Sequence, residues 1–388
     1  MESVYRNSQF TLATVAASTC HDGFLQSRAK HPEADFDFAV DGQPGLQGHF
    51  TVYFSGRQAN YDEFTMDVMD CAWIRRGWTF QERYLAPRLL FFGKQMLHFE
   101  CSTLRFTENA PDVVFDREIH WYQLLASCGK DQLRELYRWW CNFIQEYSWR
   151  DLTYQDDRLP ALSGLAKDMY SCLRRLGPAD PTYAAGIWRT DFHQGLLWFN
   201  FSLSRDVISK PLNALGGPSW SWATHDGDIG FGLTLHKLHP ACNIVSVSTT
   251  AVGPDPMGKL LSGEIRLSGR LQHFSEFKLG GTTGCEKAGF LEHVEEGEQR
   301  LVELCLDQGS RAEAVSIISK FGLWLLLVAF ADHDSTSSYT KCNGLVLLPV
   351  QAAGTSQLNV YQRVGLFRGD DSCVPVVERW PQHEVVIA

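Results

Sequence analysis

The sequence predicts a mixed α+β or α/β fold: an α/β part, then a helical segment, then a β-rich region. Three observations favour it. A helical pattern runs into a β-hairpin over residues 67–101, and two amphipathic helical patterns lie between residues 131 and 173. Short apolar runs separated by Gly, Pro, Ser and Asp fill the chain from residue 241 onward. We therefore expect domains at residues 1–105, 106–182 and 183–388, in line with roughly 100–200 residues per domain.

The first sixty residues predict little regular structure. Residues 1–9 (MESVYRNSQ) have the pattern of the last turns of a helix, and residues 10–17 (FTLATVAA) that of a buried strand. Residues 20–60 are rich in Gly, His, Asp and Pro, which is typical of a long loop region with short strands. Because a domain rarely begins halfway through a helix, this beginning predicts that upstream sequence is missing.

A helix and a hairpin are expected next. The helical pattern starts at Asp67 and stops at Pro87, since proline cannot continue a helix. Two apolar runs, RLLFF and QMLHFEC, then flank the pair Gly93-Lys94. Apolar runs around a two-residue turn that contains glycine predict a β-hairpin over residues 88–101.

Two amphipathic helices follow. Residues 131–147 carry apolar and aromatic side chains at helical spacing, which predicts one buried face. A second helix follows Asp156-Asp157, which we expect to cap it and to complement its dipole. Its apolar stripe runs from Leu162 to Leu173, and Gly177-Pro178 closes it.

The remaining chain has strand patterns. Trp220 and Trp222 alternate with Ser219 and Ser221, so we expect both indoles on one face of a strand. Further strands are predicted at residues 243–252, 263–271, 301–306, 321–330, 343–350, 359–367 and 374–378.

The composition excludes several classes of protein. Hydrophobic residues make up 44% and charged residues 21% of the chain, which argues against wholesale disorder. The net charge of −10, with no basic block, makes nucleic acid an unsuitable partner. The 12 Trp and 24 Phe are an unusual excess, and their positions therefore matter.

The cysteines and the apolar runs indicate the cellular compartment in which the protein is expected. The 11 Cys are odd in number and include no Cys-x-x-Cys pair, which favours reduced thiols in an intracellular protein over a disulfide framework or a metal site. The chain has no signal peptide pattern after Met1-Glu2. Its most apolar run, residues 321–330, is about half the ~20 residues of a membrane-spanning helix. We expect a cytoplasmic protein with no membrane partner and no metal.

Residues 75–83 contain the largest cluster of charged and aromatic side chains that could serve catalysis or ion pairing. On a helix, Trp78, Glu82 and Leu85 share one side, while Arg75, Gln81 and Arg88 can converge around another. Desolvation beside a Trp ring disfavours a charged glutamate, and a nearby arginine favours it. The residues alone leave two interpretations open, a structural Arg–Glu pair and a tuned acid or base. The sequence contains no nucleotide-binding glycine motif and no Gly-x-Ser-x-Gly elbow.

This segment, RGWTFQERYLAPRLLFF with QMLHFEC, resembles the end of the heterokaryon incompatibility (HET) domain of filamentous fungi. The residues that match the family pattern are Arg76, Trp78, Thr79, Gln81, Glu82, Arg83, Arg88, Glu100 and Cys101. The helix and strand over residues 1–17 are similar to the family's preceding segment. Three later motifs also resemble the family, at residues 157–165, 185–198 and 218–223, and the last of them contains Trp220 and Trp222. Residues 361–367 resemble the family's last strand. HET domains normally open with a further strand and a Trp-Ile-Asp motif that this sequence lacks, so the resemblance implies an N-terminally truncated domain.

The resemblance implies a function in nonself recognition and programmed cell death when unlike fungal cells fuse. It also implies a partial TIR-like, flavodoxin-like fold. Some TIR domains cleave NAD with a glutamate four residues after a Trp, and Trp78 and Glu82 have that spacing. Glu82 would then stabilise positive charge at a nicotinamide-ribose, and Trp78 would form one wall of the NAD-binding pocket.

Two functions therefore stay open: signalling by protein interaction, and NAD cleavage by Glu82. The first implies protein partners from an incompatibility pathway and no cofactor, with homo-oligomerisation as a further option. Under the second, NAD is a substrate. The absent opening strand weakens the enzyme reading, because ligands of open α/β sheets sit at the carboxyl ends of strands.

Overall fold

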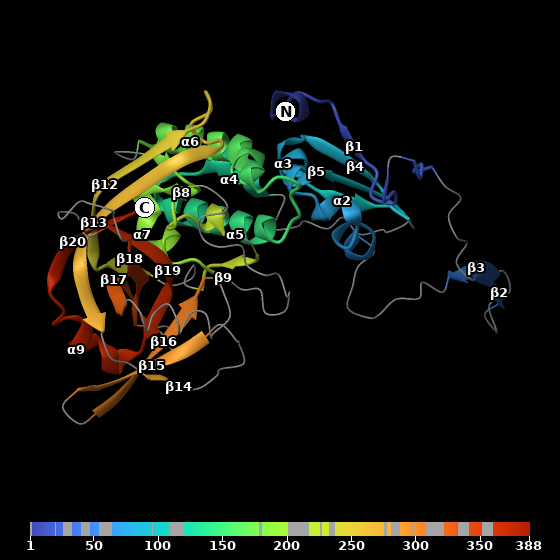
Figure 1. Ribbon diagram of the computed structural model, residues 1–388. Coiled ribbons are helices and arrows are strands. Elements are labelled where there is room, and N and C mark those ends of the chain that lie inside the picture. Colours follow the sequence, from blue (N-terminus) through green and yellow to red (C-terminus); the bar gives the residue numbers. More distant parts are fainter. Residues whose placement is uncertain are drawn as a thin grey trace. The chain divides into compact units, whose positions relative to one another are not determined.

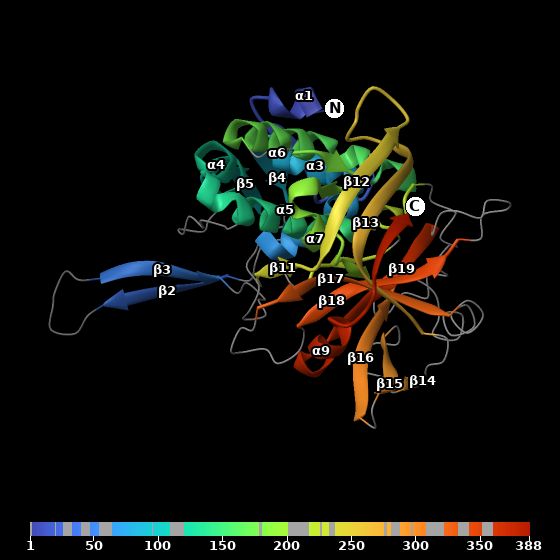
Figure 2. The same cartoon turned by 90° about the vertical axis from the view of Figure 1, so that its left-hand side faces the viewer.

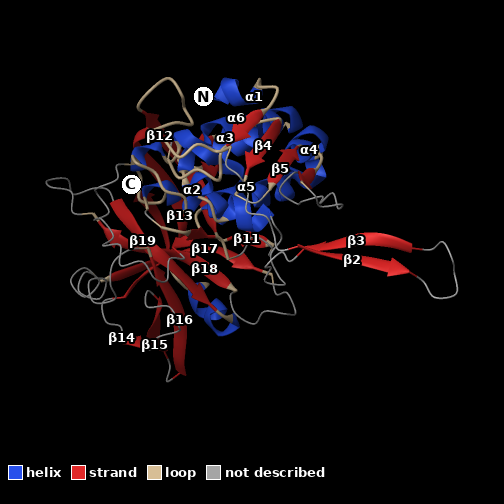
Figure 3. Ribbon diagram, turned by 90° about the vertical axis from the view of Figure 1, so that its right-hand side faces the viewer, coloured by secondary structure: helices blue, strands red, loops and turns tan. Residues whose placement is uncertain are grey.

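The chain folds into two compact units, residues 1–123 (unit 1) and residues 124–388 (unit 2), which are described separately (Figure 1). The helices and several sheets make up a mixed fold compatible with the predicted α+β class (Figure 3). The division into three domains is not tested by these units and stays a prediction. This computed structural model describes residues 2–19, 21–25, 33–39, 47–53, 64–94, 96–108, 120–177, 181–200, 217–225, 227–232, 237–274, 278–280, 288–295, 298–307, 322–332, 341–350 and 360–388.

Unit 1 contains a four-stranded sheet with the order β1-β4-β5-β6. Strand β1 pairs in parallel with β4, whereas β4 with β5 and β5 with β6 pair antiparallel. The β4–β5 pair is the predicted hairpin. The strands are β1 (Thr11–Ala13), β4 (Arg88–Phe92), β5 (Leu97–Cys101) and β6 (Arg105–Thr107).

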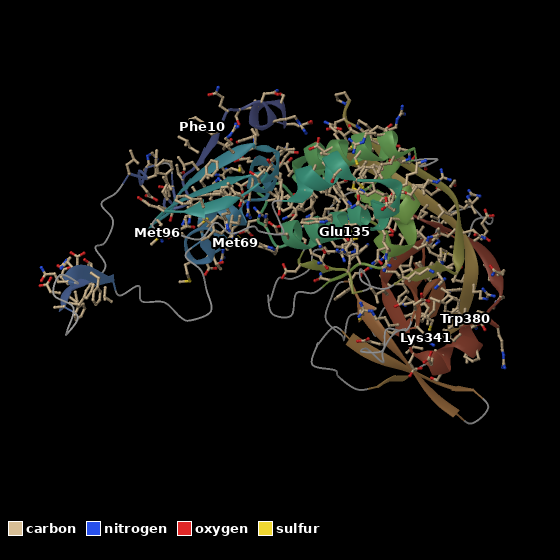
Figure 4. The ribbon with its side chains drawn as sticks, turned by 180° about the vertical axis from the view of Figure 1, so that it is seen from behind. Phe10, Met69, Met96, Glu135, Lys341 and Trp380 are labelled. Carbon is tan, nitrogen blue, oxygen red and sulfur yellow. The ribbon has the colours of Figure 1, made fainter. Side chains whose placement is uncertain are left out.

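The prediction of a buried strand over residues 10–17 is wrong in both its length and its burial. Strand β1 has three residues, and Ala13 is the buried one among them. Phe10, labelled in Figure 4, and Leu12 are 57% and 48% exposed. Within the described residues β1 pairs on one side alone, at the edge of the sheet, so much of its surface stays open.

A separate two-stranded hairpin lies in the region predicted as loop with short strands. It pairs β2 (Glu33–Ala39) with β3 (Gln47–Tyr53) in antiparallel register. Phe36 on β2 stacks on Phe50 of β3, with ring centroids 5.4 Å apart.

The helical stretch expected from Asp67 to Pro87 is broken into three pieces. These are the π-helical turn η1 (Thr65–Met69), α2 (Ala72–Arg75) and α3 (Gly77–Leu85). The breaks fall at Cys71 and Arg76, which have extended backbone; the Cys71 thiol accepts from the Ile74 amide at 3.4 Å and caps α2. The prediction missed these breaks because the side-chain pattern across them remains helical. At the N-terminus, α1 (Glu2–Arg6) confirms the predicted helix and packs against α3.

Phe92 of β4 pairs with Leu97 of β5, so the connection between the two strands is longer than the predicted turn Gly93-Lys94. The Asp67 carboxylate accounts for the difference. Its Oδ2 accepts from the Met96 amide at 3.0 Å and lies 3.1 Å from Nε2 of His98 on β5. A Cβ at position 93 would overlap this carboxylate, so glycine is required there by close approach.

Unit 2 begins with helices. α4 (His120–Ser127) spans the boundary between the units, and α5 (Leu133–Ser148) and α6 (Ser163–Leu176) confirm the two predicted amphipathic helices. Gly177 closes α6 in the left-handed conformation, with φ of 72°. The capping role expected of Asp156-Asp157 is wrong: both lie in the 3-10 turn η4 (Gln155–Asp157), and Asp156 instead pairs with Lys259 at 2.5 Å. A second turn, η5 (Pro160–Leu162), separates them from α6.

The β-rich region is confirmed as one ten-stranded sheet. Its main path is β11-β17-β13-β20-β19-β16-β15-β14, with β12 on β13 and β18 between β17 and β19. Figure 2 shows the long strands β12 and β13 side by side. The bounds are β11 (Leu238–Pro240), β12 (Cys242–Ala251), β13 (Leu260–Phe274), β14 (Lys278–Gly280), β15 (Ala288–Glu295), β16 (Glu298–Leu306), β17 (Leu323–Ala331), β18 (Cys342–Pro349), β19 (Val360–Gly369) and β20 (Gln382–Ile387).

Two strand predictions in unit 2 are wrong. Residues 374–378 form the short helix α9 (Val374–Val377) after the turn η8 (Asp371–Cys373), because Asp370 caps the turn and Pro375 suits a first helical turn. Trp220 lies in a turn, and Trp222 begins the 3-10 turn η7 (Trp222–Thr224), not a strand. Alternation over four residues is too short to separate a strand from a turn with buried aromatics.

Unit 2 also contains short elements between its helices and before this sheet. They are η3 (Lys130–Gln132), β7 (Tyr183–Ala184), β8 (Ile187–Trp188), η6 (Arg189–Asp191), α7 (Phe192–Gly195), β9 (Phe199–Asn200) and β10 (Ile229–Gly230). Within the described part of the chain, none of the helices is both long and apolar enough to cross a membrane.

Candidate functional site

The helix α3 carries the motif that the sequence singled out. Arg76 precedes it in extended conformation, and the Thr79 hydroxyl lies 2.6 Å from the Arg76 carbonyl oxygen, which fixes the first turn. Phe80, Tyr84 and Leu85 are buried in unit 1. This burial orients the helix and leaves Trp78 and Glu82, one turn apart, on a partly buried side.

Glu82 interacts with α1. The Tyr5 hydroxyl donates a hydrogen bond to its carboxylate, and the charge of Arg76 lies nearby. Burial raises the pKa of Glu82, while Tyr5 and Arg76 oppose that rise. For the same reasons, burial and the neighbouring carboxylate raise the pKa of Tyr5 to about 12. Tyr5 was not predicted as a site residue, although it lies in the N-terminal helix that the sequence predicted.

The convergence expected of Arg75, Gln81 and Arg88 is not what the structure shows. Arg75 and Arg88 are exposed, whereas Gln81 is 3% exposed. Arg88 instead donates to the Gln9 carbonyl at 3.2 Å, which links β4 to the segment before β1.

A buried Arg–Glu pair does exist in the motif, between Arg83 and Glu100. Nε and Nη2 of Arg83 donate to the two carboxylate oxygens of Glu100 at 3.0 and 2.7 Å, so the pair is bidentate. It joins α3 to β5. The Arg83 guanidinium also lies over the rings of Phe64 and Tyr84, and its Nη1 approaches the sulfur of Met69, labelled in Figure 4, at 3.9 Å.

Cys101, which ends the motif, is a free and partly buried thiol. Burial opposes its ionisation, but the hydrogen bonds from Thr103 and the charge of Arg88 outweigh burial and lower the pKa of Cys101. The Thr103 hydroxyl lies 3.2 Å from the sulfur. The thiol is therefore stabilised in its charged form within the turn between β5 and β6.

Trp220 and Trp222 lie in the core of unit 2, where both are fully buried. The Trp222 indole donates to the Gly186 carbonyl at 3.2 Å, and Trp198 donates to the Trp220 carbonyl at 3.0 Å. Gly186 has φ of 90°, and a Cβ there would overlap the Trp222 ring. The motifs at residues 185–198 and 218–223 thus pack against each other.

Arg363 lies at the centre of this packing, a role that the sequence did not predict. Its guanidinium is fully buried, pairs with Asp307 at 2.9 Å and lies 3.5 Å from the centre of the Trp198 ring. It also donates to the Leu196 and Trp198 carbonyls at 2.6 and 2.5 Å, and its amide donates to the Ser219 hydroxyl at 3.0 Å. Asp307 lies outside every motif noted in the sequence, so no sequence signal pointed to this ion pair.

Unit 2 also has a small pocket of about 30 Å³. The residues that line it are Gln155, Asp156, Arg158, Leu159, Gly217, Pro218, Ser221, Ala223, Thr224, Lys259 and Leu260. Its charged side chains have partners within the lining: Asp156 forms an ion pair with Lys259, and Arg158 donates a hydrogen bond to the Gln155 side chain at 3.2 Å. Within the described ranges, no group of three His, Cys, Asp or Glu side chains is placed to hold a metal ion.

Comparison with known proteins gives one match. Residues 1–82 match the family described as heterokaryon incompatibility protein (HET). The resemblance to the HET family is confirmed over this segment. At the family level, the match associates this segment with heterokaryon incompatibility. No curated protein and no solved structure matches the chain.

The HET segment, residues 1–82, contains α1, β1 and most of α3. It therefore includes Tyr5, Arg76, Trp78 and Glu82, the residues around the carboxylate. Arg83, Arg88, Glu100 and Cys101 lie beyond the matched residues, and their assignment to the family pattern stays a prediction. The TIR-like fold also stays a prediction.

Proposed function

We propose that this chain acts in heterokaryon incompatibility by associating with other proteins, in nonself recognition and programmed cell death of fungi, and not by catalysis. The observation that carries the proposal is the hydrogen bond from the Tyr5 hydroxyl to the Glu82 carboxylate, beside Arg76. The partners would be cytoplasmic proteins of an incompatibility pathway or further copies of the chain.

The proposal rests on what the Glu82 carboxylate already does. It accepts a hydrogen bond from α1 and interacts with the charge of Arg76, so it links α1 to α3 within unit 1. A catalytic carboxylate must instead be within hydrogen-bond reach of a substrate. A partly buried carboxylate with a donor from its own chain fits a supporting role for α3.

Expression in a filamentous fungus tests the proposal, with dye uptake by hyphal cells as the measure of cell death. We expect the wild-type chain to kill cells and Glu82→Gln to kill them equally, because a glutamine oxygen can still accept from Tyr5. Glu82→Ala, which removes the acceptor, is expected to weaken killing through loss of structure. A chain that never causes death, or a folded Glu82→Gln chain that cannot kill, would contradict the proposal.

One observation favours a second function, NAD cleavage. Burial raises the pKa of Glu82, as at tuned catalytic carboxyls, and Trp78 lies one helical turn before it. In this alternative the chain has a TIR-like site, NAD is the substrate, and the Glu82 carboxylate stabilises the positive charge that develops on the ribose as nicotinamide leaves. Glu82→Gln would then abolish both nicotinamide release and cell death.

A further inference from the structure

The strand β12 is a long edge of the large sheet in unit 2. It contains ten residues, and among the strands that the structure describes it pairs with β13 alone (Figure 2). Its first residue, Cys242, is covered by α7, because Nε2 of His193 lies 2.9 Å from the Cys242 carbonyl oxygen. In a strand with a neighbour on one side, every second residue directs its N–H and C=O groups away from that neighbour. The rest of β12 therefore offers an edge to which a further extended strand can be added.

The composition of β12 differs from that of the other edges of this sheet. Proteins usually protect edge strands from other chains with short length, charged side chains or proline. The edge strands β11 and β14 follow that rule, since each has three residues and they contain Pro240 and Lys278. The sequence of β12, CNIVSVSTTA, contains neither proline nor a charged residue. A long, uncharged edge strand rich in β-branched residues is the type that pairs with another chain.

Two irregularities limit the part of β12 that can pair in register. One follows Ile244, and the other precedes Ala251. Between them, Ser246–Thr250 pair with β13 without a register shift. The side chains of this stretch alternate between exposed and half-buried, as expected for the two faces of a strand, and the exposed ones are Ser246, Ser248 and Thr250. Five residues in regular extended conformation are thus available for pairing.

The hairpin of β12 and β13 also exposes apolar side chains. Among the described residues of unit 2, five large hydrophobic side chains are exposed, and three of these lie on the hairpin or directly after β12. They are Val245, Val252 and Leu261, which are 47%, 52% and 67% exposed. Apolar surface concentrated beside an open edge favours association at that edge.

Charge and symmetry favour a second copy of the chain as the added strand. The net charge of −10 makes copies of the chain repel each other at most surfaces, but β12 has no charged residue to place opposite its own copy. In an antiparallel pair about a two-fold axis at Ser248, each Ser248 lies opposite its copy, and Val247 lies opposite Thr249. Neutral and β-branched cross-strand pairs of this kind stabilise a sheet.

We propose that two copies of the chain form a dimer in which their Ser246–Thr250 segments pair antiparallel about a two-fold axis at Ser248. The pairing joins the two large sheets into one. Because both copies use the same edge, the assembly stops at two. This dimer specifies one class of partner in the proposed function, a further copy of the chain, and it rests on that function for its biological role.

Sedimentation velocity of the whole purified chain at several concentrations tests the proposal. We expect the wild type to form a reversible dimer whose share rises with concentration. Ser248→Lys and Ser248→Glu each place like charges opposite each other at the two-fold axis, so each should raise the dissociation constant of the dimer at least about tenfold. An equal mixture of the two variants should dimerise again, since lysine then lies opposite glutamate.

Ser262→Lys is the matched control. Ser262 is an exposed serine on β13 opposite Thr250, one strand away from the open edge, so its substitution should leave the dissociation constant unchanged. Circular dichroism checks that all variants fold. A monomeric wild type, an unchanged dissociation constant in folded Ser248→Lys, or a mixture that stays monomeric would overturn the proposal. A monomeric chain that kills hyphal cells would overturn the dimer and leave the proposed function standing.

Discussion

At the scale of single residues, Glu82 shows how neighbours decide the character of a carboxyl group. It lies one turn after Trp78, where the resemblance places a catalytic glutamate, yet its hydrogen-bond partner comes from α1. Burial raises the pKa of this carboxyl, whereas the hydroxyl of Tyr5 and the charge of Arg76 lower it and so reduce the rise. The same raised pKa fits both a catalytic acid and a structural link, so the partner of the carboxylate is more informative than the pKa.

The raised pKa of Glu82 predicts a dependence of stability on pH. The folded chain keeps this proton to a higher pH than the unfolded chain, so stability falls as pH rises from the ordinary pKa of Glu through the raised one. We expect Glu82→Gln to remove this part of the slope. Urea unfolding midpoints measured across this pH range test it, with Glu2→Gln as the control. Identical pH profiles for the wild type and Glu82→Gln would show that the folded and unfolded pKa values are equal.

At the scale of elements, unit 1 is held together by pairs that join α3 and η1 to the hairpin. The Arg83 guanidinium is 1% exposed and the Glu100 side chain 12%, so this pair is shielded from water. Removal of one partner leaves the other charge buried without compensation, and that is the costly event in such a pair.

We predict that Glu100→Gln destabilises the contact between α3 and β5 by about 3 kcal/mol. Hydrogen exchange of peptides from residues 77–85 and 97–101 measures the local opening free energy. Glu2→Gln, which breaks the more exposed Arg6–Glu2 pair at 3.2 Å, should cost under about 1 kcal/mol. Equal effects of the two substitutions would mean that burial of the Arg83–Glu100 pair has no energetic consequence.

The hairpin turn provides a second prediction at this scale. Gly93 has no positive φ, so the strain in an alanine variant comes from overlap of its Cβ with the Asp67 carboxylate and with the Met96 carbonyl oxygen. We expect Gly93→Ala to displace Asp67 from Met96 and His98 and to cost about 1–3 kcal/mol. Thermal unfolding compares it with Lys94→Ala, an exposed neighbour. A Gly93→Ala variant as stable as Lys94→Ala would show that Asp67 and the Met96 carbonyl move without cost.

At the scale of the whole chain, the excess of tryptophan has a definite place. Trp188, Trp198, Trp220 and Trp222 are buried in unit 2. There Arg363 ties the segment around Trp198 to Ser219 through its guanidinium and its amide, as well as to Asp307. Several stretches that the sequence analysis singled out thus meet in one packed core, although they are scattered through the chain, and their resemblance to HET proteins stays a prediction.

Arg363→Lys tests this arrangement. Lysine cannot donate to Asp307 and to two carbonyls from one planar group, so we expect a loss of about 3–5 kcal/mol in the stability of unit 2. Hydrogen exchange of peptides from β19 and residues 196–200 measures it. Arg379→Lys, at an exposed position after α9, should leave exchange unchanged. Comparable exchange in both variants would mean that the buried guanidinium is replaceable.

The sequence predicted the periodic elements well and the contacts between distant segments poorly. Both amphipathic helices, the β4–β5 hairpin and most strands of the large sheet follow from local side-chain patterns. The breaks at Cys71 and Arg76 were missed because they alter the backbone and leave the pattern intact. The pairs Arg83–Glu100, Tyr5–Glu82 and Arg363–Asp307 depend on which segments the fold brings together, and local patterns do not contain that information. Trp78 and Glu82 were identified through their helical spacing and the resemblance of their motif to the HET family.

The central claim, that Glu82 supports structure and does not cleave NAD, is tested most directly by nicotinamide release. The purified chain is incubated with NAD at several protein concentrations, alone and with a crowding agent that favours association, beside Glu82→Gln. We predict no release above that of buffer, and no difference between the two proteins. Release of nicotinamide by the wild type that disappears in a folded Glu82→Gln chain would contradict the account and establish the alternative.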